Sequence, residues 1–89
     1  MPVICVFNGI RVEMFQRDNK RHRLPHIHVR YNDAKAAFSI RDGSLLAGTL
    51  PPRQTRMTQA WIELRREELM ADWILAIGGK TLLLIDPLR

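Results

Sequence analysis

The sequence lacks several features that define large classes of proteins. No run approaches the roughly 18 consecutive apolar residues that a membrane span needs, so we expect no membrane association. Cys5 is the only cysteine, so no internal disulfide can form, which is typical of a reducing compartment. The beginning, MPVICVFNG, lacks the basic start and long apolar run of a secretion signal. Neither a glycine-rich phosphate loop nor a nucleophile motif is present. We therefore expect a cytoplasmic protein that needs no cofactor.

The charge of the chain is positive and uneven. The 89 residues have a formal net charge of +5, and eleven of the fourteen basic residues are arginine. Residues 1–56 carry ten basic against four acidic residues, whereas residues 57–89 carry four against five. Arginine suits bidentate binding of phosphate and carboxylate groups. This asymmetry predicts a surface for nucleic acid or an acidic protein, although a positive charge can also serve solubility alone.

The first fifty residues show the period of two that is typical of β-strands. Asn8-Gly9 and Asp42-Gly43 are hairpin signals, because tight turns between strands need backbone conformations that these residues tolerate. Residues 16–25 are polar and basic, end in a proline and are expected to form a mobile loop. The predicted strands cover residues 3–7, 10–15, 26–31, 34–40 and 44–50.

The composition from residue 53 to residue 77 is helical. Apolar residues recur at helical spacing, but the step from Leu64 to Leu69 is out of phase with a 3.6-residue repeat. We therefore expect a kink or a break near Arg65-Arg66 that divides the region into two helices. Gly78-Gly79 is a strong stop signal for the second of them.

The predicted fold class is α+β, with a small antiparallel β-sheet of four to five strands in a hairpin meander. One face of this sheet would be covered by a C-terminal helical pair, with Trp61 and Trp73 as core anchors. We expect a single domain over residues 1–89. It would comprise the sheet in residues 1–50, the helical region in 52–78, and a short C-terminal strand or extended tail in 81–86.

All three histidines lie between His22 and His28. His26 and His28 alternate on a predicted strand, so both side chains must project from one face of the sheet. If the helices cover the face that carries Val12 and Val29, the other face is exposed. The residues expected on that exposed face are Arg11, Glu13, His26, His28, Arg30, Lys35 and Arg41.

A histidine pair beside cations allows metal-independent cleavage of RNA. One neutral imidazole would take the 2′-OH proton and the other would protonate the leaving oxygen, while a cation holds the phosphate. His26 and His28 are the candidate catalytic pair, with His22 or Tyr31 as substitutes. The candidate phosphate-binding or anion-binding residues are Arg11, Arg21, Arg23, Arg30 and Lys35.

Three other hypotheses fit the same segment. His26 and His28 would be the ligands of a metal such as zinc, with His22 or Glu13 as a third ligand, but the surrounding residues are mostly basic and repel a cation. The exposed face would alternatively bind nucleic acid or an acidic protein without catalysis. Finally, the histidines would be structural, with a ring hydrogen-bonded to a loop carbonyl.

Several elements occur together in this sequence: Met1-Pro2 with a short strand, Asn8-Gly9-Ile10, His22-x-x-Pro25-His26-x-His28, Tyr31, Asp42-Gly43 to Leu50-Pro51, and Trp61…Leu64…Glu67-Glu68-Leu69…Trp73. In these the chain resembles the small bacterial proteins of domain of unknown function family 4160 (DUF4160), over nearly its full length. The resemblance implies a toxin-like component of a type II toxin–antitoxin pair, neutralised by a cognate small antitoxin-like protein with a helix-turn-helix-like fold. A homodimer through the sheet face or an edge strand is a further expectation.

Overall fold

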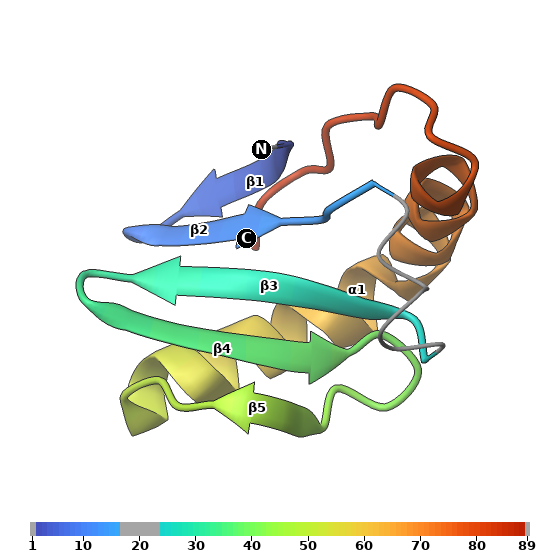
Figure 1. The fold of residues 1–89 in the computed structure, drawn as a ribbon. Coiled ribbons are helices and arrows are strands. Elements are labelled where there is room, and N and C mark those ends of the chain that lie inside the picture. Colours follow the sequence, from blue (N-terminus) through green and yellow to red (C-terminus); the bar gives the residue numbers. More distant parts are fainter. Residues whose placement is uncertain (1, 17–23, 89) are drawn as a thin grey trace.

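The structure is a computed structural model that describes residues 2–16 and 24–88. It contains one five-stranded antiparallel sheet with the strand order β1-β2-β3-β4-β5 and one helix behind it (Figure 1). The α+β class and the meander are therefore confirmed. The elements are β1 (Val3–Phe7), β2 (Ile10–Glu13), β3 (His26–Tyr31), β4 (Ala34–Ser39), β5 (Leu45–Gly48) and α1 (Pro52–Ile77).

The hairpin turns have the backbone that the sequence predicts. Asn8 and Gly9 join β1 to β2 with φ angles of 50° and 76°, the pair of positive values that a type I′ turn requires. Asn32, with a φ of 52°, begins the turn between β3 and β4. Both turns lie at the same end of the sheet (Figure 1). The predicted mobile loop falls mainly on residues 17–23, which lie outside the described residues.

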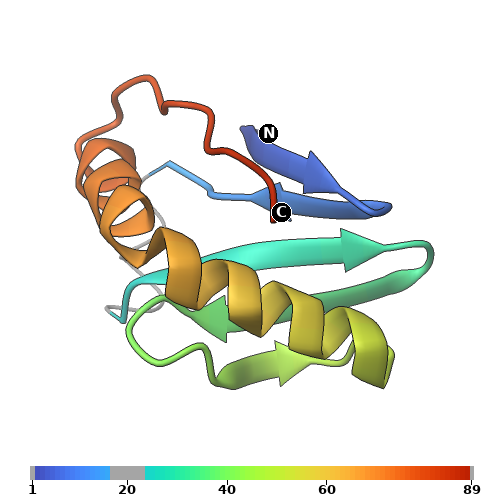
Figure 2. The same cartoon turned by 180° about the vertical axis from the view of Figure 1, so that it is seen from behind.

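The expectation of two helices is wrong, because residues Pro52–Ile77 form one helix, α1, with a kink inside it. The irregularity does occur at the predicted place: Arg65 has non-helical angles of φ −109° and ψ 18°. The kink redirects the second half of α1, so the buried Trp61 before it and the buried Leu69 after it both reach the core. The first half of α1 crosses behind the sheet, and the second half turns past the end where β3 begins (Figure 2).

The core lies between α1 and the sheet face turned toward it. That face includes Val12, Val29 and Phe38, each at most 1% exposed. Trp61 is fully buried, and its ring lies 5.8 Å from that of Phe7, measured between centroids. Both tryptophans are buried, as expected for core anchors. In the described ranges, no helix has the length and apolarity needed to cross a membrane.

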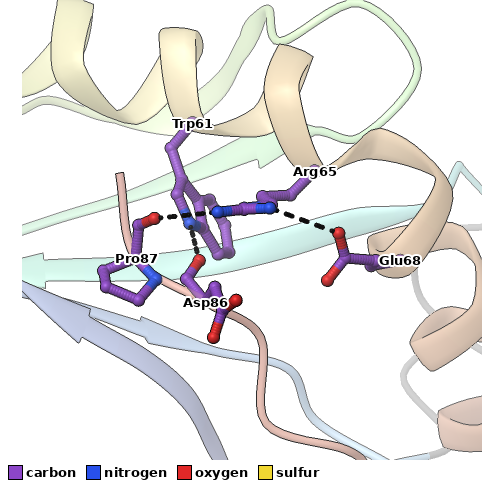
Figure 3. A network of polar contacts seen from close by, with 5 residues as sticks. All are labelled: Trp61, Arg65, Glu68, Asp86 and Pro87. Atoms are coloured by element: carbon purple, nitrogen blue, oxygen red, sulfur yellow. Dashed lines mark hydrogen bonds and ion pairs between the residues drawn. The ribbon is translucent and has the colours of Figure 1, made fainter. Parts of the chain in front are cut away.

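The C-terminal segment, residues 80–88, forms neither helix nor strand and returns across the helix side of β1 and β2 (Figure 2). It is held to α1 at the kink (Figure 3). Trp61 Nε1 donates to the carbonyl oxygen of Asp86 at 2.8 Å, and Arg65 donates to that of Pro87 at 3.2 Å. Arg65 also lies 3.6 Å from the Glu68 carboxylate.

Further hydrogen bonds hold this segment along its length. The backbone N–H of Ile85 donates to the carbonyl oxygen of Ile4 in β1 at 2.9 Å. The backbone N–H of Leu83 donates to Oδ1 of Asp72 at 3.0 Å. Asp72 is only 1% exposed, and its Oδ2 is buried with no hydrogen-bond partner within residues 2–16 and 24–88. Burial raises the pKa of the Asp72 carboxyl from its usual 3.8, and the nearby Glu68 adds to this increase.

We expect Asp72→Asn to stabilise the protein at neutral pH. Because the folded-state pKa of Asp72 lies above the unfolded value, folding favours the protonated carboxyl, and ionisation weakens the fold as the pH rises above about 4. Asparagine keeps an acceptor for the Leu83 N–H and carries no charge to desolvate. Thermal unfolding from pH 4 to pH 8 should show a gain in Tm that grows with pH. The exposed Glu63→Gln on the same helix is the control, and a pH-independent gain at Asp72 would contradict the prediction.

Candidate functional site

Three basic side chains form a row across the sheet face that is turned away from α1, here called the front face. The strand register pairs Arg11 of β2 with Arg30 of β3, and Arg30 with Lys35 of β4. Neighbouring strands are about 4.8 Å apart, so the three backbone positions span about 10 Å. Arg11 and Lys35 are exposed, and Arg30 is partly exposed. We call these three residues the basic row.

One carboxylate neutralises part of this row. Arg30 Nε donates to Oε1 of Glu13 at 3.1 Å, and the Glu13 side chain is only 3% exposed whereas that of Arg30 is 38% exposed. The expectation of an exposed Glu13 is therefore wrong, although Glu13 does lie on the front face, opposite His28 in the register. Within the described part of the chain, neither Arg11 nor Lys35 forms an ion pair.

The two histidines lie together, as their spacing predicts. Their ring centroids are 5.1 Å apart in an edge-to-face arrangement. His26 is only 1% exposed, so the expectation that both rings are exposed is wrong for this residue. The reason is the kinked helix, whose second half places the Trp73 ring 5.1 Å from the His26 ring. Nδ1 of His26 donates to the carbonyl oxygen of Leu24 at 2.8 Å, since a carbonyl can only accept.

His28 is half-buried and contacts a ring that follows the neighbouring strand β2. The centroid of the Phe15 ring, just beyond β2, lies 4.3 Å from that of His28. Phe15 is also half-buried, so these two rings present part of their surface beside the basic row. His28 and Arg30 are two residues apart on β3, which corresponds to about 7 Å along the strand. We call Phe15 and His28 the ring pair.

The other predicted site residues are not brought to this place. Tyr31 alternates with Arg30, so it lies on the opposite face of β3, half-buried against the core. His22, Arg21 and Arg23 lie outside the described residues. Arg41, expected on the same face, is exposed but follows the end of β4.

The metal hypothesis has two candidate ligands in contact with each other, His26 and His28. Among residues 2–16 and 24–88, no group of three or more histidine, cysteine, aspartate or glutamate side chains has an arrangement that could hold a metal ion. Glu13, the expected third ligand, instead binds Arg30. His22, which was the other candidate for a third ligand, lies outside the described residues.

Trp73 and Phe15 were not expected at this site, and Glu13 was not expected to bind Arg30. Trp73 was expected only in the core, yet it covers His26; Phe15 was not singled out, yet it contacts His28. Continuing the alternation of β2 from Glu13 to Phe15 would have placed the Phe15 ring on the front face. The pairing of Glu13 with Arg30 needs the strand register, which the sequence does not contain.

The fold and this site define a small α+β domain with a basic sheet face and a partly buried histidine pair. The model of the family described as domain of unknown function (DUF4160) matches residues 9–74. The chain therefore belongs to this family, and the match covers β2 to β5, the basic row and most of α1. Comparison with curated proteins and with solved structures found no match.

Proposed function

We propose that this protein binds single-stranded RNA through the front face of its sheet. The observation that carries the proposal is the combination of the basic row, Arg11, Arg30 and Lys35, with the adjacent ring pair on the same face. Proteins that bind single strands combine cations that follow the backbone with rings on which bases stack. Both components are present within about 10 Å of each other on one rigid element.

The electrostatic part of the proposal rests on an imbalance within the front face. Three cations stand in register, and Glu13 is the one carboxylate that the described residues place against them. Like charges directly opposite each other destabilise a sheet, so an anion bound between them removes an unfavourable interaction. The phosphate backbone of RNA supplies such anions at regular spacing.

The ring pair supplies the second component. Stacking on a ring contributes about 1–3 kcal/mol per base and tolerates every base, since each has a π-face. The His28 ring is fixed from two sides, by Phe15 and by His26, and His26 is in turn covered by Trp73. We therefore assign His26 a positioning role beneath His28, in place of direct contact with the RNA.

This assignment favours binding over cleavage by the two histidines. An acid and a base that cleave RNA must approach the 2′-OH and the leaving oxygen from two sides of one phosphate. His26 and His28 project from one face, and the His26 ring is buried under Trp73. A metal-independent ribonuclease would need His22 as the second catalytic group. Cleavage of RNA is therefore a hypothesis distinct from the RNA binding proposed here.

We expect the double variant Arg11→Ala/Lys35→Ala to bind a single-stranded RNA 10-mer at least about tenfold more weakly than the parent at low salt. Two phosphate contacts would be lost, so the slope of log K against log salt concentration should decrease by about 1.4. The measurement is fluorescence anisotropy over a series of salt concentrations.

The matched control is Arg53→Ala/Arg56→Ala, which removes the same charge from two exposed positions on α1. This control should keep the parental slope. Equal losses in both variants would mean that net charge alone drives binding and would refute the front-face assignment. Loss of intact RNA in either sample, with and without a chelator, would instead indicate cleavage and show whether it needs a metal.

The toxin-like role implied by family resemblance remains a proposal that the RNA-binding surface supports. A cognate small antitoxin-like protein with an acidic surface would neutralise the protein by covering the basic row. The same two double variants distinguish this mechanism in bacterial cells. If the row carries the activity, Arg11→Ala/Lys35→Ala relieves growth inhibition and Arg53→Ala/Arg56→Ala does not; no effect of the parent on growth would remove the toxin proposal.

A further inference from the structure

The front face contains a depression at the end of the sheet where the two hairpin turns lie. Its volume is about 290 Å³, and it is lined by Gly9, Arg11, Arg30 and Asn32. Gly9 belongs to the turn between β1 and β2, and Asn32 to the turn between β3 and β4. Among the residues that the structure describes, the lining thus contains two arginines, one asparagine and one glycine, with no acidic and no apolar side chain.

The two arginines of this depression are held close together by the sheet itself. Arg11 and Arg30 are direct partners in the register of β2 and β3, where Cα atoms are about 4.5–5.5 Å apart. Two like charges at this separation repel each other across the strands. Glu13 lies two residues from Arg11 and binds Arg30, so it offsets part of the repulsion. Within residues 2–16 and 24–88 no carboxylate pairs with Arg11, which lines the same depression.

Asn32 adds a neutral donor beside these cations. Its backbone has a φ of 52°, in the left-handed region that asparagine tolerates better than most residues. Asn32 is exposed and lines the depression together with Arg30. An amide N–H and two arginine forks together offer more donors than one phosphodiester, with its two free oxygens, can accept.

We infer that this depression binds a terminal phosphate monoester, so that the protein recognises a phosphorylated end of an RNA strand. A monoester carries a charge of about −1.5 to −2 at pH 7 and three acceptor oxygens, which match two guanidinium groups and an amide better than an internal phosphate does. The inference rests on the proposed function, because it names the part of the RNA that reaches one end of the basic row.

The test compares three RNA 10-mers of identical sequence at constant ionic strength: one with a 5′-phosphate, one with a 3′-phosphate, and one with hydroxyls at both ends. An 11-mer with hydroxyl ends carries one extra phosphodiester and controls for added charge. We expect one of the two phosphorylated strands to bind at least tenfold more tightly than the 11-mer, and the strand that does so identifies the end that is recognised.

Asn32→Gly is the matched variant, since glycine adopts the positive φ without cost and removes only the amide side chain. It should lose most of the preference for the phosphorylated end and keep the affinity for the hydroxyl-ended strands. Equal affinity for all strands in the parent would refute the terminal-phosphate inference and leave RNA binding intact. Failure of every strand to bind would refute both proposals.

Binding of a phosphate monoester to the depression can also be tested without RNA, by thermal unfolding. Adenosine 5′-monophosphate should raise the Tm of the parent more than adenosine does, because the dianion relieves the repulsion between Arg11 and Arg30. The Asn32→Gly variant should show a smaller difference between the Tm shifts caused by the nucleotide and the nucleoside. An equal response of the parent to both compounds would count against the site.

Discussion

Replacing Trp61 with alanine is expected to lower the free energy of unfolding by at least about 3 kcal/mol. Truncation of a buried tryptophan costs about 3–5 kcal/mol, while domains of this kind are stable by about 5–15 kcal/mol in total. Trp61 is fully buried, lies 5.8 Å from the Phe7 ring and donates its indole N–H to Asp86. Its loss therefore leaves a cavity and also releases the C-terminal segment from α1.

The measurement is urea unfolding followed by circular dichroism, with Trp61→Phe and Ile74→Ala as companions. Phenylalanine keeps most of the buried area and loses the hydrogen bond, so its cost should be clearly smaller. Ile74 is 64% exposed on the same helix, so its truncation should change stability by less than about 1 kcal/mol. A cost for Trp61→Ala as small as that for Ile74→Ala would contradict the packing described here.

Replacing Gly48 with alanine is the second change expected to have a large effect. Gly48 ends β5 with a φ of 70°, and a Cβ atom there would lie 2.1 Å from the carbonyl oxygen of Lys35. The contacted atom belongs to the backbone of β4, so the two strands must separate locally. We expect a loss of at least about 2 kcal/mol, from the left-handed backbone and the clash together.

The comparison variant is Gly43→Ala, because it isolates the backbone term. Gly43 has a similar φ of 74°, but its Cβ would meet only the Gln59 side chain at 3.8 Å. It should lose about 1–2 kcal/mol from the left-handed conformation alone. Hydrogen exchange at β5 amides should increase selectively in Gly48→Ala. Equal losses at both glycines would show that β4 accommodates the added atom.

Much of the sheet follows from local signals in the sequence. Alternation placed Val12 and Val29 on one face and Arg11 and Arg30 on the other, because successive side chains of a strand point to opposite faces of the sheet. Asn8-Gly9 predicted the first turn correctly, since the required backbone is open to very few residue types. These predictions succeeded because each depends on neighbours within a few positions.

The burial of His26 and Glu13 could not be predicted in the same way. Alternation assigns a side chain to a face, but it does not say which distant segment covers that face. His26 is buried because the second half of α1 turns at Arg65 and brings Trp73 to the start of β3. The out-of-phase step near Arg65 indicated a change of direction but not whether the helix breaks or bends, nor the direction in which it continues.

Some features of the candidate site could likewise be predicted from the sequence, and others could not. The residues of the basic row were all predicted from charge and alternation, because they depend on their own strands. Their alignment in one row, and the ion pair that Glu13 forms with Arg30, depend on the pairing of β2 with β3 across the basic loop. Such pairing is a property of the assembled sheet and leaves no trace in either strand alone.

The hydrogen bond between Ile85 and Ile4 has a consequence for synthesis in the cell. The first strand is covered in part by residues that are synthesised well after the sheet, in the segment whose Asp86 carbonyl accepts the indole N–H of Trp61. Contacts between such distant positions form slowly and late. The nascent sheet is therefore expected to expose apolar surface until residues 80–88 have been synthesised, and such surface promotes aggregation during that interval.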